Sequence, residues 1–116
     1  MRTEILQCGL LKVKAAEMIN HVPLERIRRM YKVDPEGYMK ISMNVLLVDT
    51  GEQVVLFDPG CAEFLPARLK AEYGFEMAES LEEILGHTGY KINQVTDVIF
   101  THLHFDHGSG AFKRIP

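Results

Sequence analysis

Three of the five histidines lie within six residues, and an aspartate stands among them. The segment reads HLHFDH and runs from His102 to His107. In an extended chain, side chains alternate between two sides, so His102 and His104 would point the same way and could bind one metal ion. A turn after Phe105 would direct Asp106 and His107 toward a second ion. Because imidazole and carboxylate ligands suit ions of the zinc type, the segment predicts two adjacent metal ions.

The residues around these candidate ligands have simpler expected roles. Leu103 and Phe105 are apolar, and we expect them to pack away from the ions and hold the loop in place. The remaining histidines, His21 and His87, are isolated in the sequence, and we expect them to be surface or capping residues.

The candidate ligands follow a short apolar run, DVIFT, which we expect to form a short buried strand over 97–101. Functional residues of α/β proteins gather at strand ends and in the loops beyond them. A strand is predicted over 5–13, and two more over 40–49 and 53–58 form a β-hairpin around a turn that includes Gly51.

Helices fill the rest of the chain. The segment 14–39 is predicted to be irregular, with one short helix that begins near Pro23. A second helix is expected over 64–73. A third begins at Ser80, because Ser80 and Glu83 have the spacing of a capping box. The order of elements is therefore strands, then helices, then a strand that leads into the histidine cluster.

Composition limits the class of protein. A chain of 116 residues that is 47% hydrophobic and 25% charged is typical of one globular domain, or part of one, and not of a disordered segment. A net charge of −3 gives no basic surface for a nucleic acid. No apolar run is long enough to span a membrane. Two cysteines are too few for a disulfide scaffold, so we expect a cytoplasmic protein.

Two stretches of the sequence resemble a known family. THLHFDHGSG resembles the HxHxDH signature of the metallo-β-lactamase superfamily, although Ser109 stands where that family usually has glycine. NVLLVDTGEQVVLFDPG is similar to the leading hairpin of that family, which ends in an Asp-x-Gly turn, here Asp58-Pro59-Gly60. The resemblance covers about 40–112. HLHFDH is similar to the lactonase-like branch, while the glyoxalase II and phosphodiesterase branches share its HxHxDH core.

The resemblance implies a fold of the α+β or α/β class, a four-layer αβ/βα sandwich, of which 1–116 would be the N-terminal half as a partial domain. It implies that His102 and His104 bind the first ion, and that Asp106 and His107 bind the second. The cofactor would be two divalent metal ions, Zn first, with Fe or Mn as alternatives. Hydroxide generated at the ions would attack a carbonyl or phosphoryl centre.

Two aspartates have further roles under this resemblance. Asp106 would also orient the nucleophile, which makes it the candidate catalytic residue. Asp58 would lie behind the ligands and hold their loop by hydrogen bonds. An equally good interpretation is that Asp58 is a turn residue that caps Gly60. The sequence alone leaves both open.

A complete domain of this family is about twice as long as this chain, so the remaining ligands would come from elsewhere. We expect the partner to be a missing C-terminal half or a second copy of this chain. The fragment alone is expected to be inactive. Its strands would lose cover, and the apolar side chains expected to face water include Val45, Leu47, Val55, Phe57, Val98 and Ile99.

The predicted function is that of a metal-dependent hydrolase acting on a small-molecule lactone, ester or thiolester. Two alternatives stay open. One is a di-iron oxidoreductase on the same scaffold, and the other is a non-catalytic half-domain that only binds metal. Zinc in the purified protein would favour the hydrolase, whereas iron with a visible absorption band would favour redox chemistry.

Overall fold

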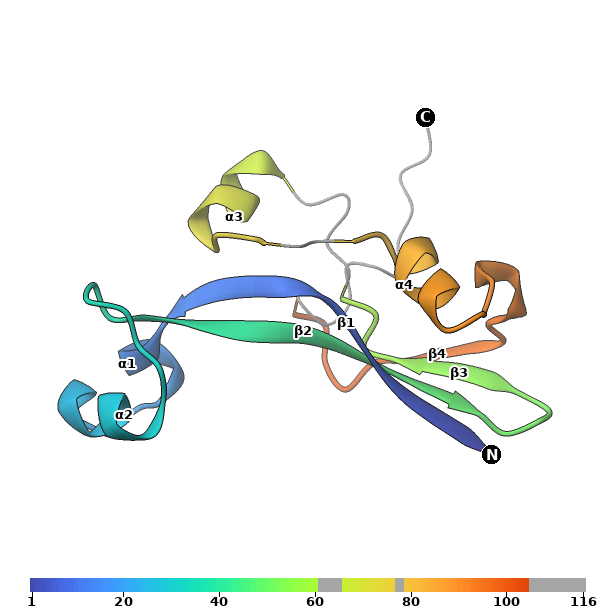
Figure 1. The fold of residues 1–116 in the computed structure, drawn as a ribbon, viewed down its shortest axis with the longest axis horizontal. Coiled ribbons are helices and arrows are strands. Elements are labelled where there is room, and N and C mark those ends of the chain that lie inside the picture. The colour runs from blue at the N-terminus through green and yellow to red at the C-terminus, as the bar shows by residue number, and fades with distance from the viewer. Residues whose placement is uncertain (61–65, 77–78, 105–116) are drawn as a thin grey trace.

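A single four-stranded sheet organises the chain in the computed structural model, which describes residues 1–60, 66–76 and 79–104. The strands are β1 (Arg2–Lys14), β2 (Tyr38–Asp49), β3 (Val54–Phe57) and β4 (Asp97–Ile99). They lie in the order β1-β2-β3-β4 (Figure 1). The first two neighbouring pairs are antiparallel, whereas β3 and β4 run parallel. The sheet is therefore mixed, with the parallel pair at one side.

The predicted hairpin is confirmed and is closed by local hydrogen bonds. The Asp49 carboxylate accepts a hydrogen bond from the Gly51 backbone N–H at 2.9 Å, and Thr50 N–H donates to Gln53 O at 2.9 Å. Gly51 has a φ of +93°, a left-handed conformation that glycine adopts without steric cost. The turn between β2 and β3 is thus specified by the residues that form it.

Within the described parts of the chain, four helices and one short 3-10 helix connect the strands. They are α1 (Ala15–Met18), α2 (Leu24–Met30), α3 (Ala67–Glu72), α4 (Leu81–His87) and η1 (Ile92–Gln94). The helix predicted at Pro23 is confirmed as α2, and the Ser80 hydroxyl accepts a hydrogen bond from Glu83 N–H at the start of α4. Residues 64–65 of the helix predicted over 64–73 lie outside the described residues, and the rest contains α3. None of the helices in the described ranges has the length and apolar character needed to cross a bilayer.

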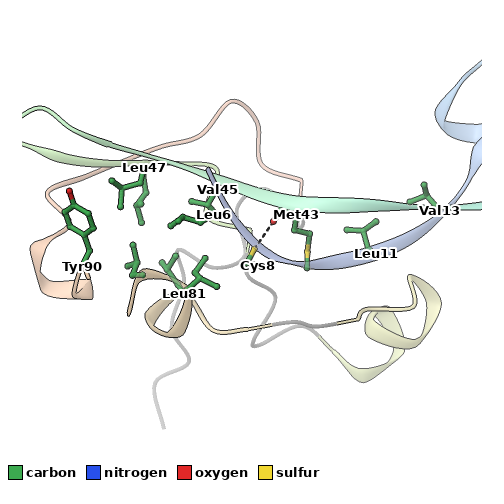
Figure 2. Packing of buried hydrophobic residues seen from close by; sticks show 12 residues of the cluster. Leu6, Cys8, Leu11, Val13, Met43, Val45, Leu47, Leu81 and Tyr90 are labelled. Carbon is green, nitrogen blue, oxygen red and sulfur yellow. Dashed lines mark hydrogen bonds between the residues drawn. The ribbon is translucent and has the colours of Figure 1, made fainter. Parts of the chain in front are cut away.

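One face of the sheet carries the core. Helices α3 and α4 belong to the connection from β3 to β4 and lie on the same side of the sheet (Figure 1). Figure 2 shows Leu6, Val45 and Leu47 directed toward the segment that carries Leu81 and Tyr90. Cys8 is fully buried among them, and its thiol donates to Met43 O at 3.3 Å. The chain therefore buries one apolar face of the sheet with its own residues.

This packing corrects two expectations about exposure. Val45 and Leu47 are fully buried and Val55 is 9% exposed, so the expectation that they face water is wrong. The reason is that α4 packs over the face on which Val45 and Leu47 lie. Val98 and Ile99 do face water, with 41% and 45% of each residue exposed. The strand predicted over 97–101 is confirmed as β4 over 97–99, but it is not buried in this chain, because β4 is an edge strand that pairs only with β3 among the described strands.

The opposite face of the sheet carries an apolar row with one residue from each strand. Ile5 pairs with Leu46, Leu46 pairs with Phe57, and Phe57 pairs with Ile99. The exposed fractions of Ile5, Leu46 and Ile99 are 74%, 37% and 45%. A contiguous apolar surface of this kind is uncommon on a free-standing soluble protein. Phe57 is half-buried. We call these four residues the exposed row.

Neighbouring leucines on β2 test this assignment of faces. Leu47→Ala removes a fully buried side chain and is expected to lower the free energy of unfolding by about 2 to 5 kcal/mol. Leu46→Ala, one residue away on the exposed row, is the matched control and is expected to cost under about 1 kcal/mol. Urea unfolding of both variants measures the difference. Equal losses would show that the two faces are not covered as described.

A partly buried hydrogen bond between Tyr90 and Asp49 joins the segment after α4 to the hairpin. The Tyr90 hydroxyl donates to the Asp49 carboxylate at 2.6 Å, and the Arg2 guanidinium lies 5.1 Å from the centre of the Tyr90 ring. The hydrogen bond from Tyr90, followed by that from Gly51 N–H, lowers the pKa of Asp49. The same contact with Asp49 raises the pKa of Tyr90.

This contact predicts a pH-dependent stability. Because the pKa of Asp49 is lower in the folded state, its contribution is present above the unfolded value of about 3.9 and is lost as the pH falls through the folded value. Tyr90→Phe removes the hydroxyl, so the free energy of unfolding should fall less steeply at acidic pH than it does in the wild type. Urea unfolding from about pH 6 down to about pH 2 measures it, with Tyr31→Phe as the exposed control. An unchanged pH profile in Tyr90→Phe would contradict the assignment.

Candidate metal centre

The parallel pair of strands sets the position of the candidate site. The carboxyl ends of parallel strands meet at one edge of a sheet, which is where α/β proteins gather functional residues. Asp58 N–H continues the ladder beyond β3 by donating to Ile99 O at 3.0 Å. The residue that follows β3 is therefore brought beside the residues that follow β4, although more than forty positions separate them in the sequence.

Asp58 is buried at this edge and binds the segment that leads into the histidines. It is 8% exposed and has a φ of +52°, a left-handed conformation that aspartate and asparagine adopt more readily than other non-glycine residues. Its Oδ1 accepts a hydrogen bond from Thr101 N–H at 2.7 Å, and its Oδ2 accepts one from the Thr101 hydroxyl at 2.6 Å. Asp58 therefore makes the contact that one of its two interpretations requires, namely hydrogen bonds to the segment that leads into the histidines. Its role toward a metal stays a prediction.

The first two candidate ligands lie side by side. The ring centres of His102 and His104 are 4.6 Å apart, with an angle of 79° between the ring planes, and both residues are exposed. Leu103 between them is 74% exposed, so the expectation that it packs and holds the loop is wrong. Residues 102–104 lie beyond the last residue of β4, where no described strand pairs with them. The two hydrogen bonds between Thr101 and Asp58 anchor this segment to the sheet.

The second pair of candidate ligands, Asp106 and His107, lies outside the described residues, as does Phe105. Across residues 1–60, 66–76 and 79–104, no three potential ligands gather in one place. Two neighbouring imidazoles nevertheless fit a zinc-type ion, and they would supply two of the three protein ligands that a catalytic zinc normally has. The binding of metal by these residues stays a prediction.

The other two histidines stand apart from this pair. His87 is the last residue of α4, and its Nε2 lies 2.6 Å from the Glu79 carboxylate. Its side chain is 68% exposed. His21 is also exposed, between α1 and α2. The expectation that both lie at the surface is confirmed, which makes His87 a useful control for tests of metal binding.

Thr101 is the residue at this site that the sequence argument did not single out. Its hydroxyl lies 2.6 Å from Asp58 Oδ2 and 3.0 Å from His102 Nδ1, so it joins the buried carboxylate to a candidate ligand. In the sequence, the one feature that could have pointed to Thr101 is that a residue with a hydroxyl group directly precedes the first histidine of the cluster. Its significance depends on the position of Asp58, which only the pairing of β3 with β4 reveals.

A separate hollow with a volume of about 360 Å³ lies beside the C-terminal end of β1, and residues of α1 and α3 also line it. The polar residues that line it are Lys12, Lys14, Glu17, Tyr38, Glu72 and Tyr73. None of the predicted site residues lines it. We therefore do not assign it to the chemistry of the histidine pair.

Solved structures of three proteins share this fold. A probable metal-dependent hydrolase from Staphylococcus aureus superposes with a TM-score of 0.87 at 20% identity over 94% of this chain, which shows likeness of fold. The hydrolase AbOPH of the beta lactamase superfamily matches with a TM-score of 0.72 at 25% identity over 96% of the chain. AidC, a dizinc quorum-quenching lactonase solved with a product bound, matches with a TM-score of 0.68 at 26% identity over 93%.

The matches also define how much of the fold this chain contains. It spans 40%, 36% and 35% of the lengths of these three proteins, so its mixed sheet and helices form part of an αβ/βα sandwich. No curated protein matches the sequence. The family model of the metallo-beta-lactamase superfamily matches residues 41–113, which include most of the hairpin, Asp58 and the whole histidine cluster. The chain belongs to the metallo-beta-lactamase superfamily.

Proposed function

We propose that this chain supplies the first metal-ligand segment of a metal-dependent hydrolase that opens a lactone or an ester. The observation that carries the proposal is the pair of imidazoles of His102 and His104, which lie in contact at the carboxyl ends of β3 and β4. In a member of this superfamily, that placement agrees with the ligands predicted from the HLHFDH motif.

Each candidate residue has a distinct task in this proposal. His102 and His104 hold the first ion, and Asp106 and His107 hold the second. Asp106 also orients the attacking nucleophile, while Asp58 fixes the loop through Thr101. Two zinc ions bound there would supply hydroxide near neutral pH and polarise the carbonyl group of the substrate. Iron or manganese could take the same ligands.

The substrate class rests on two observations. AidC, one of the similar proteins, is described as a lactonase. The net charge of −3 offers no general attraction for a nucleic acid, so a phosphodiester of that kind ranks last. A lactone or ester ranks first and a thiolester second.

The exposed row indicates what this chain needs to become complete. Ile5, Leu46, Phe57 and Ile99 form an apolar surface on the sheet face opposite α3 and α4. We propose that residues 1–116 are a partial domain and that the other part of the sandwich, or a second copy of the chain, covers this row. The same partner would contribute the remaining metal ligands, since two histidines fall short of a catalytic zinc site.

The test compares residues 1–116 alone with a protein that carries them in a complete sandwich. Both are assayed with added zinc against an N-acyl homoserine lactone, a simple ester, a thiolester and a phosphodiester. The complete protein is expected to hydrolyse the lactone or ester and to lose that activity with a chelator. The chain alone is expected to be inactive and to associate in solution, which its measured mass would show.

Several outcomes would overturn the proposal. Hydrolysis of no substrate by the zinc-loaded complete protein would remove the assignment as a hydrolase. Iron with a visible absorption band, and no hydrolysis, would support the oxidoreductase alternative instead. A monomeric 116-residue chain that turns over substrate would contradict the claim that the site is incomplete.

A further inference from the structure

We propose that residues 1–5 pair with the same residues of a second copy of this chain, as antiparallel strands related by a two-fold axis at Thr3. The surface is the outer edge of β1, the margin of the sheet that faces away from β2. Figure 1 shows this part of β1 beside the N mark, at the end of the sheet away from α1 and α2. The two sheets would join into one. This pairing is independent of metal binding and of the proposed hydrolase activity.

The outer edge of β1 is only partly covered by the backbone of its own chain. Along the second half of the strand, Leu10 and Glu76 exchange two backbone hydrogen bonds at 2.8 and 2.9 Å, and Lys12 N–H donates to Tyr73 O. Along Arg2–Leu6, no backbone hydrogen bond to this outer edge occurs among the described residues. A strand edge with open N–H and C=O groups is a template on which another strand can pair.

The backbone groups that point outward can be identified from the side chains. In one strand, residues whose side chains lie on the same face direct their N–H and C=O groups to the same edge. Leu10 faces the outer edge in this way and alternates with the buried Leu11. Thr3 and Ile5 alternate with the buried Leu6, so their backbone groups also point outward. The register shift in the middle of β1 exchanges even for odd positions between the two stretches.

The sequence of this edge is complementary to itself. With the axis at Thr3, Arg2 lies opposite the second copy's Glu4, and Met1 lies opposite its Ile5. The central position pairs Thr3 with its own counterpart. Opposite charges, apolar pairs and Thr–Thr pairs each stabilise antiparallel strands. Like charges on an edge strand oppose pairing between copies, but here the charges alternate in sign and attract. This complementarity is what identifies a second copy as the partner.

The charged residues also occupy the closer kind of antiparallel position. Because Thr3 directs its backbone groups outward, it would exchange hydrogen bonds with its counterpart. Arg2 and Glu4 would then form non-hydrogen-bonded pairs, whose Cα atoms lie only about 4.5 Å apart. Arg2 donates to Glu4 of its own chain at 2.9 Å and to Thr88 O at 3.2 Å, and a guanidinium has further N–H donors for a second carboxylate. The pairing lies in the plane of the sheet and leaves the exposed row accessible.

A cysteine on the two-fold axis tests the register in the 116-residue chain. Thr3→Cys is expected to form a covalent dimer on mild oxidation, because Cα atoms of a hydrogen-bonded pair lie about 5.5 Å apart, which a disulfide spans. Ile5→Cys is the matched control, since it would lie opposite Met1 and roughly 13 Å from its own counterpart. Cys8 is fully buried, and Cys61→Ser in both variants removes the other native thiol. Non-reducing electrophoresis measures the yield of dimer.

Reversal of single charges tests the ion pairs, in chains that also carry Thr3→Cys. Arg2→Glu alone, or Glu4→Arg alone, places like charges opposite each other and should lower the yield of covalent dimer roughly tenfold. A mixture of the two variants should restore it, because every acidic position then meets a basic one. Arg29→Glu makes the same change of charge on the exposed surface of α2 and should leave the yield unchanged.

The expected pattern is cross-linking through Thr3→Cys and recovery on mixing, and recovery would also show that both charge variants fold. Equal yields from Thr3→Cys and Ile5→Cys would overturn the pairing, as would a mixture that cross-links no better than either variant alone. A chain whose measured mass is that of a monomer would overturn it too. Association without cross-linking at Thr3 would place the contact elsewhere, such as at the exposed row, and would equally contradict the inference.

Discussion

His102→Ala, in a complete protein of the proposed hydrolase type, is expected to remove both the zinc of the first site and the activity. His102 is one of the two predicted ligands of that ion that lie within the described residues, and its ring centre lies 4.6 Å from that of the other, His104. Changing a hydrogen-bond partner of a metal ligand already costs roughly 10- to 100-fold in affinity or activity. Removal of the ligand itself should therefore lower kcat by more than about 100-fold. Metal content measured beside kcat checks both effects.

The matched control for this change is His87→Ala. His87 is a histidine of the same chain, but it lies on α4 and pairs with Glu79. We expect it to keep the metal content and turnover of the wild type. If His102→Ala retains first-site zinc, or if His87→Ala loses it to the same extent, the assignment of the first ion is wrong.

Asp106→Asn is expected to lower turnover without removing zinc from the first metal site. The change should lower turnover roughly 10²- to 10⁴-fold, the range for loss of a group that positions or transfers a proton. The first-site zinc should remain, because His102 and His104 are unchanged. The measurement is again zinc content beside kcat. Near-normal turnover in Asp106→Asn would show that its assigned role is mistaken.

The local features of this fold could be predicted because the residues that specify them are neighbours in the sequence. The hairpin turn depends on Asp49, Thr50 and Gly51, which bond to one another and to the next residues. The start of α4 depends on Ser80 and Glu83, only three residues apart. Signals of this kind need no knowledge of the tertiary structure.

The errors arose where the outcome depends on which element covers which surface. Val45 and Leu47 carry the same apolar character as Leu46, and only the position of α4 decides that their face is buried. The run at 97–101 reads as a buried strand, yet β4 lies at the edge of the described sheet and exposes Val98 and Ile99. Periodicity identifies two faces but does not say which one is covered.

In the candidate site, too, the local features could be predicted and the features that depend on tertiary structure could not. The histidine pair could be predicted from its spacing, because alternation in an extended segment is a local property. The link from Asp58 through Thr101 to His102 could not, since it requires β3 and β4 to lie parallel with their ends at one edge. A short motif thus predicts the ligands, while the contacts of Asp58 and Thr101 behind them became visible only in the fold.

The central claim is that this chain provides ligands to a two-metal site, and metal content tests it most directly. The measurement is elemental analysis of a purified protein that carries these residues in a complete sandwich, before and after incubation with Zn, Mn or Fe. The proposed site predicts about two transition-metal ions per chain, with zinc favoured. Finding no transition metal under any of these conditions would contradict it.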